Sequence, residues 1–249
     1  MTVYSLFLSL LWALAIGGLA WYSLSIARQI TYVTLADGRR QERTLPLLFK
    51  LLLPLAPNLR PLFRRGFLAP VREKLSRKIV SAGFAGLISN DELLSLHFLC
   101  PLVIGPFWIV LVHTALARLQ GPQAQRLAMT LDLAGVGWLA ASPGLWLSRA
   151  LKDRHASIRR SLPFVLDMLT LSVEAGMDFM TAMQRNVERG RIDPLGEELV
   201  RVIREIQLGK TRRQALRDMA ARVRLPDLRT VIGALVQADE LGVSIGAIL

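Results

Sequence analysis

Residues 193–227 read DPLGEELVRVIREIQLGKTRRQALRDMAARVRLPD, and this stretch decides the fold that the sequence predicts. It contains two helix starts, Asp193-Pro194 and Thr211 with Gln214 three residues later, each followed by apolar residues at helical spacing. Gly209 stands between them, at a place where glycine often ends a helix. No alternation of apolar and polar residues interrupts the pattern, so the stretch predicts two short, capped, amphipathic helices and no strand.

The same pattern continues on both sides of this stretch and predicts a compact six-helix bundle over residues 149–249. The last of the six helices has neither a cap nor a polar tail, which leaves two alternatives: the natural protein stops in the middle of this helix, or the sequence lacks a further segment after Leu249. The six expected starts are Ser161 with Pro163, Asp178, Asp193, Thr211, Pro226 with Asp227 and Ser244, and the glycines expected to end helices are Gly176, Gly190, Gly209 and Gly242.

Three apolar runs precede the bundle, and each is long enough to cross about 30 Å of hydrocarbon as a helix. They cover residues 1–27, 93–117 and 127–148. The chain as a whole is 52% hydrophobic and 20% charged, with a mean hydropathy of +0.39, which disfavours a purely soluble protein. Prolines inside the second and third runs do not exclude membrane helices, because neighbouring groups can satisfy the freed carbonyls.

The first run could alternatively be a cleaved secretory signal, because Ser25-Ile26-Ala27 has the small residues of a cleavage site. We favour a membrane helix. The run lacks a basic amino-terminal region and is longer than the apolar part of most signals. Cleavage would also place the following basic segment outside the cell.

Basic residues orient the predicted spans, because they accumulate on the cytoplasmic side. Residues 28–93 hold 12 Lys or Arg against 5 Asp or Glu, and residues 149–249 hold 17 against 13. Both segments are therefore expected inside and the amino terminus outside. The predicted domains are a membrane helix at 1–27, a basic cytoplasmic segment at 28–92, a membrane hairpin at 93–148 and the cytoplasmic bundle at 149–249.

The net charge of +12 suggests that the chain binds an anionic partner, either nucleic acid or an anionic membrane surface. Nucleic acid is not expected, because the docking motifs and interleaved aromatic residues are missing. Anionic lipid headgroups at the inner leaflet are expected to attract a basic cluster after the third apolar run. That cluster comprises Arg149, Lys152, Arg154, Arg159 and Arg160.

Residues 28–92 contain five prolines, which restrict this segment to short helices. A helix over residues 45–55 is too short to span and is expected to lie on the inner leaflet. Another is expected over residues 71–82, ended by Gly83. Ser89 and Glu92 have the spacing of a capping box, which would start the second membrane helix.

Motifs of catalysis and cofactor binding are not found, so no enzyme activity, cofactor or metal is predicted. Cys100 is the single cysteine, and His97 and His113 are sixteen residues apart on one expected helix, too far to bind one metal. Asp132 is the one carboxylate inside a predicted span, where an ionisable group suggests function. Its place near the outer end of that span favours contact with water or headgroups instead.

The bundle resembles the type II secretion F domain family, and within it the TadB and TadC types of the tight-adherence (Flp) pilus system, with the TadC type the better fit. The likeness covers residues 155–249 and consists of turn, cap and core residues in a fixed order. They are Leu162-Pro163, Leu166-Asp167, Leu169, Glu174-Ala175-Gly176, Pro194-Leu195, Glu198-Leu199, Glu205, Gly209, Ala215-Leu216, Ala220, Pro226-Asp227-Leu228, Val236-Gln237, Glu240-Leu241-Gly242 and Ile245.

The resemblance implies a non-enzymatic platform in the bacterial inner membrane, built as a homo- or hetero-oligomer. Its implied partners are a hexameric motor ATPase, a paralogous platform subunit and pilin. We expect the motor to contact the polar face formed by Arg212, Arg213 and Arg217, together with Glu197 and Glu198. The alternative for these five residues is an ordinary solvated surface.

Two other function classes fit the same layout of membrane helices and bundle. A small-solute transporter would need polar or broken helices around a cavity at the bilayer midplane, for which Asp132 alone offers little. A membrane-anchored adaptor would differ from a platform only in its partner.

Overall fold

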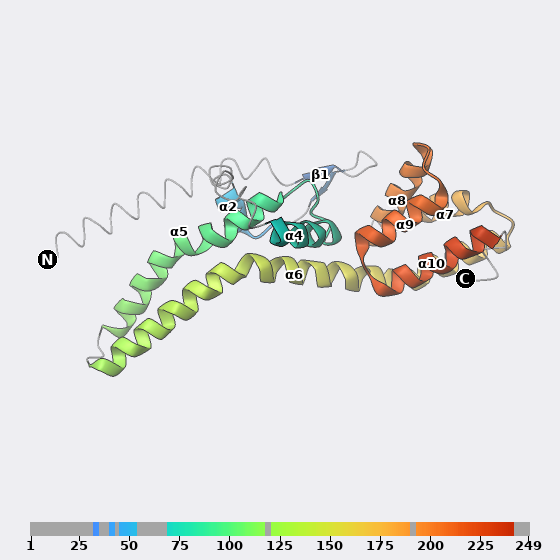
Figure 1. Cartoon of the computed structure of the whole chain (residues 1–249). Helices are drawn as coiled ribbons and strands as arrows, with labels where there is room; N and C mark the ends of the chain where they lie inside the picture. The colour runs from blue at the N-terminus through green and yellow to red at the C-terminus, as the bar shows by residue number, and fades with distance from the viewer. Residues whose placement is uncertain are drawn as a thin grey trace. The chain divides into compact units, whose positions relative to one another are not determined.

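The computed structural model describes residues 32–34, 40–42, 45–53, 69–117, 121–189 and 193–241. Helices dominate these residues, which confirms the predicted all-α class (Figure 1). The sequence did not predict one pair of three-residue strands, β1 (Tyr32–Thr34) and β2 (Arg40–Glu42), which form a two-stranded sheet. The helices are α2 (Leu47–Leu52), α4 (Ala69–Ser81), α5 (Asn90–Leu116), α6 (Pro122–Glu174), α7 (Phe179–Arg189), α8 (Pro194–Gln207), α9 (Arg212–Val223) and α10 (Pro226–Leu241).

The chain divides into two compact units, and two of the divisions fall inside helices α4 and α6. We call the first the hairpin unit; its described helical and loop residues are 45–53, 69–76, 86–117 and 121–146. We call the second the head; its described residues are 34, 40–41, 77–85 and those from 147 onward. The head therefore includes residues 77–85, which lie far from the bundle in sequence.

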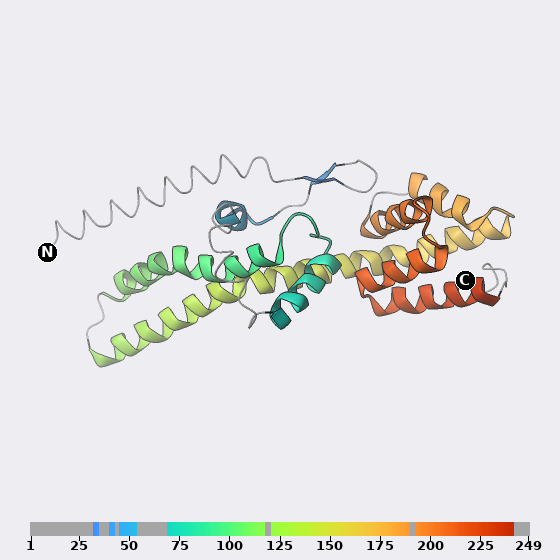
Figure 2. The ribbon, with the colours of Figure 1, turned by 45° about the horizontal axis from the view of Figure 1, so that its top comes forward.

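In the hairpin unit, α5 and the first part of α6 lie side by side and run in opposite directions (Figures 1 and 2). The predicted capping box starts α5. The Ser89 Oγ accepts a hydrogen bond from the Glu92 amide at 3.3 Å, and the Glu92 carboxylate accepts one from the Ser89 amide at 2.9 Å. Pro101 and Pro106 lie inside α5, so these prolines do not end the helix.

Helix α2 packs against α5 through fully buried leucines, Leu52 on α2 and Leu93 and Leu96 on α5. The ring of Phe49 on α2 meets Trp146 edge to face, with 5.3 Å between the ring centres. The sequence predicted this short helix over residues 45–55, and its observed bounds lie inside that range. Burial of its apolar side holds the short helix in place, since an isolated helix of this length would not be stable.

Among the described helices, α5 is long and apolar enough to cross a membrane. The third predicted run is helical within α6, and the first lies outside the described residues. Both arms of the hairpin expose large apolar side chains to their surroundings. They are Phe98, Leu102, Phe107, Ile109, Val110 and Leu111 on α5, and Leu127, Met129, Leu131, Leu133, Trp138 and Leu145 on α6.

The expected helix start at Ser161 and Pro163 is wrong, because α6 continues through both residues to Glu174. The Ser161 hydroxyl does not cap a helix; it donates back to the carbonyl oxygens of Ser157 or Ile158, one turn earlier. Pro163 removes one backbone donor, at a cost of about 3 kcal/mol in an exposed helix. Burial of Leu162 and Val165 on either side offsets that cost.

The other predicted starts in the described part of the head are confirmed. The Asp193 carboxylate accepts from the Gly196 amide at 2.7 Å, and the Thr211 hydroxyl accepts from the Gln214 amide at 3.2 Å. Asp178 caps α7 through the Met180 amide at 3.0 Å. Gly176 and Gly209 end helices with φ of 88° and 98°, a conformation that favours glycine. The predicted ends at Gly190 and Gly242 and the start at Ser244 lie outside the described residues.

In the head, α7, α8, α9 and α10 surround the last part of α6 (Figures 1 and 2). Each contributes one apolar face to a common core, which is the packing that the helical spacing predicted. The buried core residues are Ile158, Leu162, Val165, Leu169, Phe179, Ala182, Met183, Leu195, Leu199, Val202, Ile203, Ala215, Leu216, Met219, Ala220, Val223, Leu225, Leu228, Ile232 and Val236.

Candidate functional site

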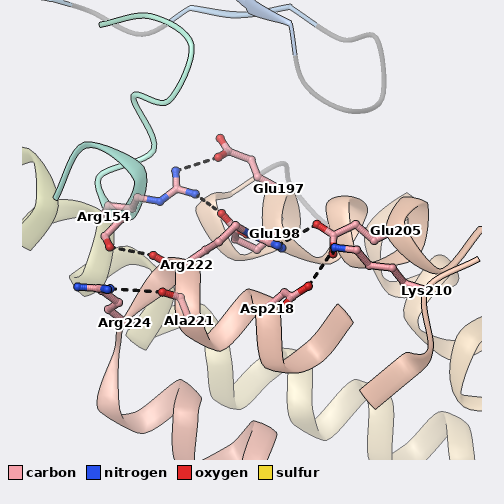
Figure 3. A network of polar contacts seen from close by, with 10 residues as sticks. Arg154, Glu197, Glu198, Glu205, Lys210, Asp218, Ala221, Arg222 and Arg224 are labelled. Atoms are coloured by element: carbon pink, nitrogen blue, oxygen red, sulfur yellow. Dashed lines mark hydrogen bonds and ion pairs between the residues drawn. The ribbon is translucent and has the colours of Figure 1, made fainter. Parts of the chain in front are cut away.

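A buried ion-pair junction joins α6 to α8 inside the head (Figure 3). The Arg154 guanidinium lies between the carboxylates of Glu197 and Glu198. It donates from Nη1 to Glu197 Oε2 at 2.9 Å and from Nη2 to Glu198 Oε1 at 3.0 Å. All three residues are at least nine-tenths buried. One cation of α6 is therefore shared by two adjacent carboxylates of α8.

The junction continues toward α9 through Arg222 (Figure 3). The Arg222 Nε donates to Glu198 Oε2 at 3.2 Å, and its Nη1 donates to Glu205 Oε1 at 2.8 Å. Lys210 then bridges Glu205 and Asp218, with Nζ–O distances of 3.0 and 2.9 Å. The network thus links three helices with three cations and four carboxylates, and it passes from the buried interior to the exposed surface.

Two side chains hold the carbonyl end of α9 at the same place. The Ser81 hydroxyl lies 2.8 Å from the Arg222 carbonyl oxygen, and the His155 Nε2 lies 2.8 Å from that of Val223. The last carbonyls of a helix have no partner within the helix, so these contacts satisfy them. Arg224 follows with φ of 57° and ends α9. The contact of Ser81 lies within the head, to which residues 77–85 belong.

The network is suited to fixing helices. Each carboxylate in it is bound by a cation that belongs to another helix or to the α8–α9 turn. Desolvating charges is costly, so such a network specifies an arrangement of helices more than it adds stability. In addition, Arg154 Nε and Arg222 Nη2 are buried without an acceptor in the described part of the chain.

The burial of this network corrects three expectations. Glu197 and Glu198 were expected on the outer surface, in contact with the motor, and they are 7% and 6% exposed inside the head. Arg154 was expected at lipid headgroups, and it is 7% exposed between the two carboxylates. Arg159, which belongs to the same expected lipid-binding cluster, is exposed and forms an ion pair with Asp227. The distance between its Nε and the Asp227 Oδ2 is 2.6 Å.

The three arginines of the expected motor face do lie on the surface of α9, with exposed side-chain fractions of 41–57%. Each is paired with an acidic residue of a neighbouring element. Arg212 meets Asp178 at 3.3 Å, Arg213 meets Asp239 at 3.0 Å, and Arg217 meets Glu240 at 2.8 Å. The surface therefore alternates in charge, and we call these six residues the α9 charge surface.

In the hairpin unit, Asp132 lies beside His113, with 3.7 Å between Oδ2 and Nδ1. The His113 ring also contacts the carbonyl oxygen of Ile109 at 3.0 Å. His97 bonds instead to the carbonyl oxygen of Leu93 at 2.8 Å, so the two histidines serve separate local contacts. The His155 side chain is half-buried, with its ring against the carbonyl oxygen of Val223.

Within the described ranges, no group of three or more His, Cys, Asp or Glu side chains could hold a metal ion. No protein-family model matches the chain, and no curated protein or solved structure matches it either.

The exposed end of the network gives a pH-dependent stability. Hydrogen bonding from Lys210 lowers the pKa of Asp218, and the bonds to Asp218 and Glu205 raise the pKa of Lys210. The Asp218 contribution is present above an ordinary carboxylate pKa of about 3.9 and is lost as the pH falls through its lowered value. The Lys210 contribution is present below about 10.4 and is lost as the pH rises through its raised value.

We therefore expect Lys210→Met to lower the melting temperature slightly at neutral pH, because both groups are exposed. The difference from the wild type should vanish at pH values below the lowered pKa of Asp218 and above the raised pKa of Lys210. Thermal unfolding of both proteins across the pH range measures it. A difference that stays constant in acid would show that the ion pair is not its cause.

Proposed function

We propose that this chain is a multi-pass inner-membrane platform subunit of a tight-adherence type IV pilus assembly machine. In this role it couples a cytoplasmic motor ATPase to the insertion or extraction of pilin. The observation that carries the proposal is that one helix, α6, contains both an apolar stretch at 127–148 and the residue on which the head is fixed, Arg154.

The apolar surface of the hairpin unit supports a membrane location. Helix α5 meets the length and composition of a span, and its exposed side chains at positions such as Phe98, Leu102 and Phe107 are large and apolar. Water disfavours a continuous surface of this kind, whereas lipid does not. With the basic segments inside, the proposal places the amino terminus in the periplasm and the head in the cytoplasm.

The internal structure of the head supports a mechanical role. A subunit that transmits work must keep its helices fixed while a partner acts on them. The junction around Arg154 fixes α8 and α9 to α6, and side chains cap α7, α8 and α9 at their starts. The proposal assigns no catalytic residue and no cofactor to the chain.

The α9 charge surface is the proposed contact for the motor ATPase. Alternating charges on an exposed surface favour one partner and one orientation, since wrong alignments bring like charges together. The proposed contact does not include Glu197 and Glu198, because both side chains are buried. The membrane helices would pair with a paralogous platform subunit and contact pilin. Anionic lipid headgroups would contact the basic residues that remain exposed at the start of the head, Arg149, Lys152 and Arg160.

The test is co-purification of the full chain with the hexameric motor ATPase of the same tight-adherence system. We expect the triple variant Arg212→Glu, Arg213→Glu and Arg217→Glu to lose most of the binding. It should lower the melting temperature only modestly, because exposed ion pairs worth about 0–1 kcal/mol each are replaced by exposed like-charge contacts of similar size.

A matched control reverses three other exposed arginines of the head, Arg201, Arg204 and Arg229. It changes the net charge equally and should leave binding near the wild-type level. Equal binding by both triple variants would contradict the proposed contact. Labelling of Arg212→Cys from the periplasm would contradict the proposed orientation and with it the platform role.

A further inference from the structure

Two side chains bring separate helices to the carboxyl end of α9. Ser81 on α4 and His155 on α6 each contact one of its last two carbonyl oxygens, at 2.8 Å. An exposed lysine lies one turn before each of them, Lys78 before Ser81 and Lys152 before His155. Residues three apart on a helix are neighbours on its surface, so both lysines lie close to the end of α9.

Arg224 adds a cation at the same place. It follows the last residue of α9 with φ of 57°, and its Nε donates to the carbonyl oxygen of Ala221 at 3.4 Å. Figure 3 shows Arg224 at the opposite end of the ion-pair network from Lys210. Arg149 lies one turn before Lys152 on α6. We call Lys78, Arg149, Lys152 and Arg224 the basic patch of the head.

The basic patch has positive charge to offer to an external anion. Its four side chains are exposed, and none of them pairs with a carboxylate of the residues that the structure describes. The arginines at the amino end of α9, by contrast, are each paired with an acidic residue. The last carbonyls of α9, which would repel an anion, are already covered by Ser81 and His155. Asp153 is the one carboxylate within residues 147–156, so the patch keeps a net positive charge.

The patch begins where the apolar stretch of α6 ends. A helix rises about 1.5 Å per residue, so Arg149 and Lys152 lie about 2 and 6 Å beyond Ser148. The headgroup layer extends about 5–7 Å beyond the hydrocarbon on each side of a bilayer, which places both cations at its depth in the proposed orientation. Arg224 lies one turn further on, at the level of His155, and its long side chain can extend back toward the phosphates.

We propose that the basic patch binds the phosphate groups of anionic phospholipids in the inner leaflet, so that the carboxyl end of α9 faces the membrane and its amino end faces the cytoplasm. The inference deepens the platform role and rests on it for the cytoplasmic location of the head. Helix α9 has 12 residues. It is therefore about 18 Å long, which keeps the α9 charge surface at its amino end clear of the headgroups and accessible to the motor.

A soluble phosphate-bearing molecule would use the same chemistry, but it fits the arrangement less well. The four cations come from α4, α6 and the end of α9, and a single small anion would need them to converge on one point. A membrane surface presents many phosphates at once, so each cation contributes without such convergence. The position of the patch directly after an apolar stretch also favours lipid.

Fluorescence quenching on the full chain in nanodiscs tests the contact. In a Cys100→Ser background, a bimane label at Ala221→Cys reports the carboxyl end of α9, and one at Gln207→Cys reports the opposite end; both positions are exposed. The quencher is carried on the lipid headgroup. With phosphatidylglycerol mixed into phosphatidylcholine, we expect severalfold stronger quenching at Ala221→Cys than in phosphatidylcholine alone, and little quenching at Gln207→Cys in either.

Charge removal identifies the residues responsible. The triple variant Lys78→Gln, Lys152→Gln and Arg224→Gln should reduce quenching at Ala221→Cys to the level in phosphatidylcholine alone, with an unchanged melting temperature. Raising the salt concentration should have the same effect on the wild type. The matched control Arg185→Gln, Arg201→Gln and Arg204→Gln removes three exposed charges from α7 and α8 and should leave the quenching intact.

Three results would overturn the proposal: quenching at Ala221→Cys that does not depend on phosphatidylglycerol, equal quenching at Gln207→Cys, or equal behaviour of the two triple variants. Inorganic phosphate separates the two sources of the anion. If it raised the melting temperature of the wild type but not of the Lys78, Lys152 and Arg224 variant, and quenching did not depend on lipid charge, a soluble anion would be the ligand and the lipid contact would be wrong.

Motor binding separates this inference from the platform role. The Lys78, Lys152 and Arg224 variant should still co-purify with the motor ATPase, because its α9 charge surface is unchanged. Motor binding by the wild type without charge-dependent quenching would refute the lipid contact alone. Charge-dependent quenching in a wild type that does not bind the motor would support the lipid contact and count against the platform role.

Discussion

Replacing Arg154 with methionine is expected to destabilise the head by about 3–5 kcal/mol, which makes it the most damaging single charge change in the network. The substitution keeps an apolar side chain of similar length but removes the cation that Glu197 and Glu198 share, so that Arg222 is the cation that remains on this buried pair, through Glu198. The two carboxylates would then repel each other or take up protons, and either outcome opposes the native packing of α8 on α6.

Thermal unfolding of the detergent-solubilised full chain, followed by circular dichroism, measures this effect. Arg159→Met is the matched control, because Arg159 lies on the same helix and is also ion-paired, but its side chain is 62% exposed. We expect it to change stability by less than about 1 kcal/mol. Similar losses for Arg154→Met and Arg159→Met would show that burial of the junction is not what matters.

A triple variant separates the loss of a cation from the loss of packing. Combining Arg154→Met with Glu197→Gln and Glu198→Gln removes all three charges and keeps the volumes similar. We expect this variant to be more stable than Arg154→Met alone, because it no longer buries two carboxylates beside each other, while Arg222 keeps its ion pair with Glu205. Equal stability losses in Arg154→Met and in the triple variant would mean that Arg154 stabilises the head through its packing and not through its charge.

Local signals explain why the sequence predicted most of the fold correctly. A helix cap depends on a side chain and an amide within three residues, as in Ser89 with Glu92 and Asp193 with Gly196. The bounds of α8 and α9 follow directly from such pairs. Pro163 was misleading because proline is common at a helix start but tolerated inside a helix whose flanks are buried.

Contacts between distant residues explain what the sequence could not predict. Glu198 lies three residues after Leu195 and four before Val202, so its place on the apolar stripe of α8 could have indicated burial. Glu197 lies off that stripe and gave no such signal. Their partner, Arg154, is more than forty residues away, and it stands among other basic residues that resemble a lipid-binding cluster.

The same limit applies to Ser81. It is buried and contacts the carbonyl oxygen of Arg222, which is 141 residues further along the chain. No spacing rule links the two positions, and residues 77–85 were therefore expected outside the head. Phe164, Met168 and Leu171 on α6 are the opposite case, since their helical spacing is visible in the sequence but their exposure is not.

Gly135→Ala is the second substitution expected to have a large effect, and it acts in the hairpin unit. A Cβ at Gly135 would overlap the indole of Trp108 on α5, with the Trp108 Cδ1 at 2.6 Å. The indole cannot move freely, because its Nε1 donates to the carbonyl oxygen of Leu131 at 3.1 Å. Forcing an atom into this contact is expected to destabilise the hairpin by about 1–3 kcal/mol.

Gly137→Ala provides the control, because a Cβ at Gly137 meets nothing within 4 Å. At this position alanine should stabilise the helix by up to about 1 kcal/mol, since glycine is the poorer helix former. The same chemical change two residues apart is thus expected to have opposite signs. Melting temperatures of both variants in the same detergent give the comparison.

Removing the indole should reverse the effect at Gly135. In a Trp108→Leu background the added methyl group has space, so Gly135→Ala should become neutral or stabilising there. Such a non-additive result between two contacting residues would show that the arms of the hairpin meet through this contact. If Gly135→Ala lowered the stability equally with and without Trp108, the loss would not come from an overlap with the indole. That result would contradict the close approach of α5 and α6 at Gly135.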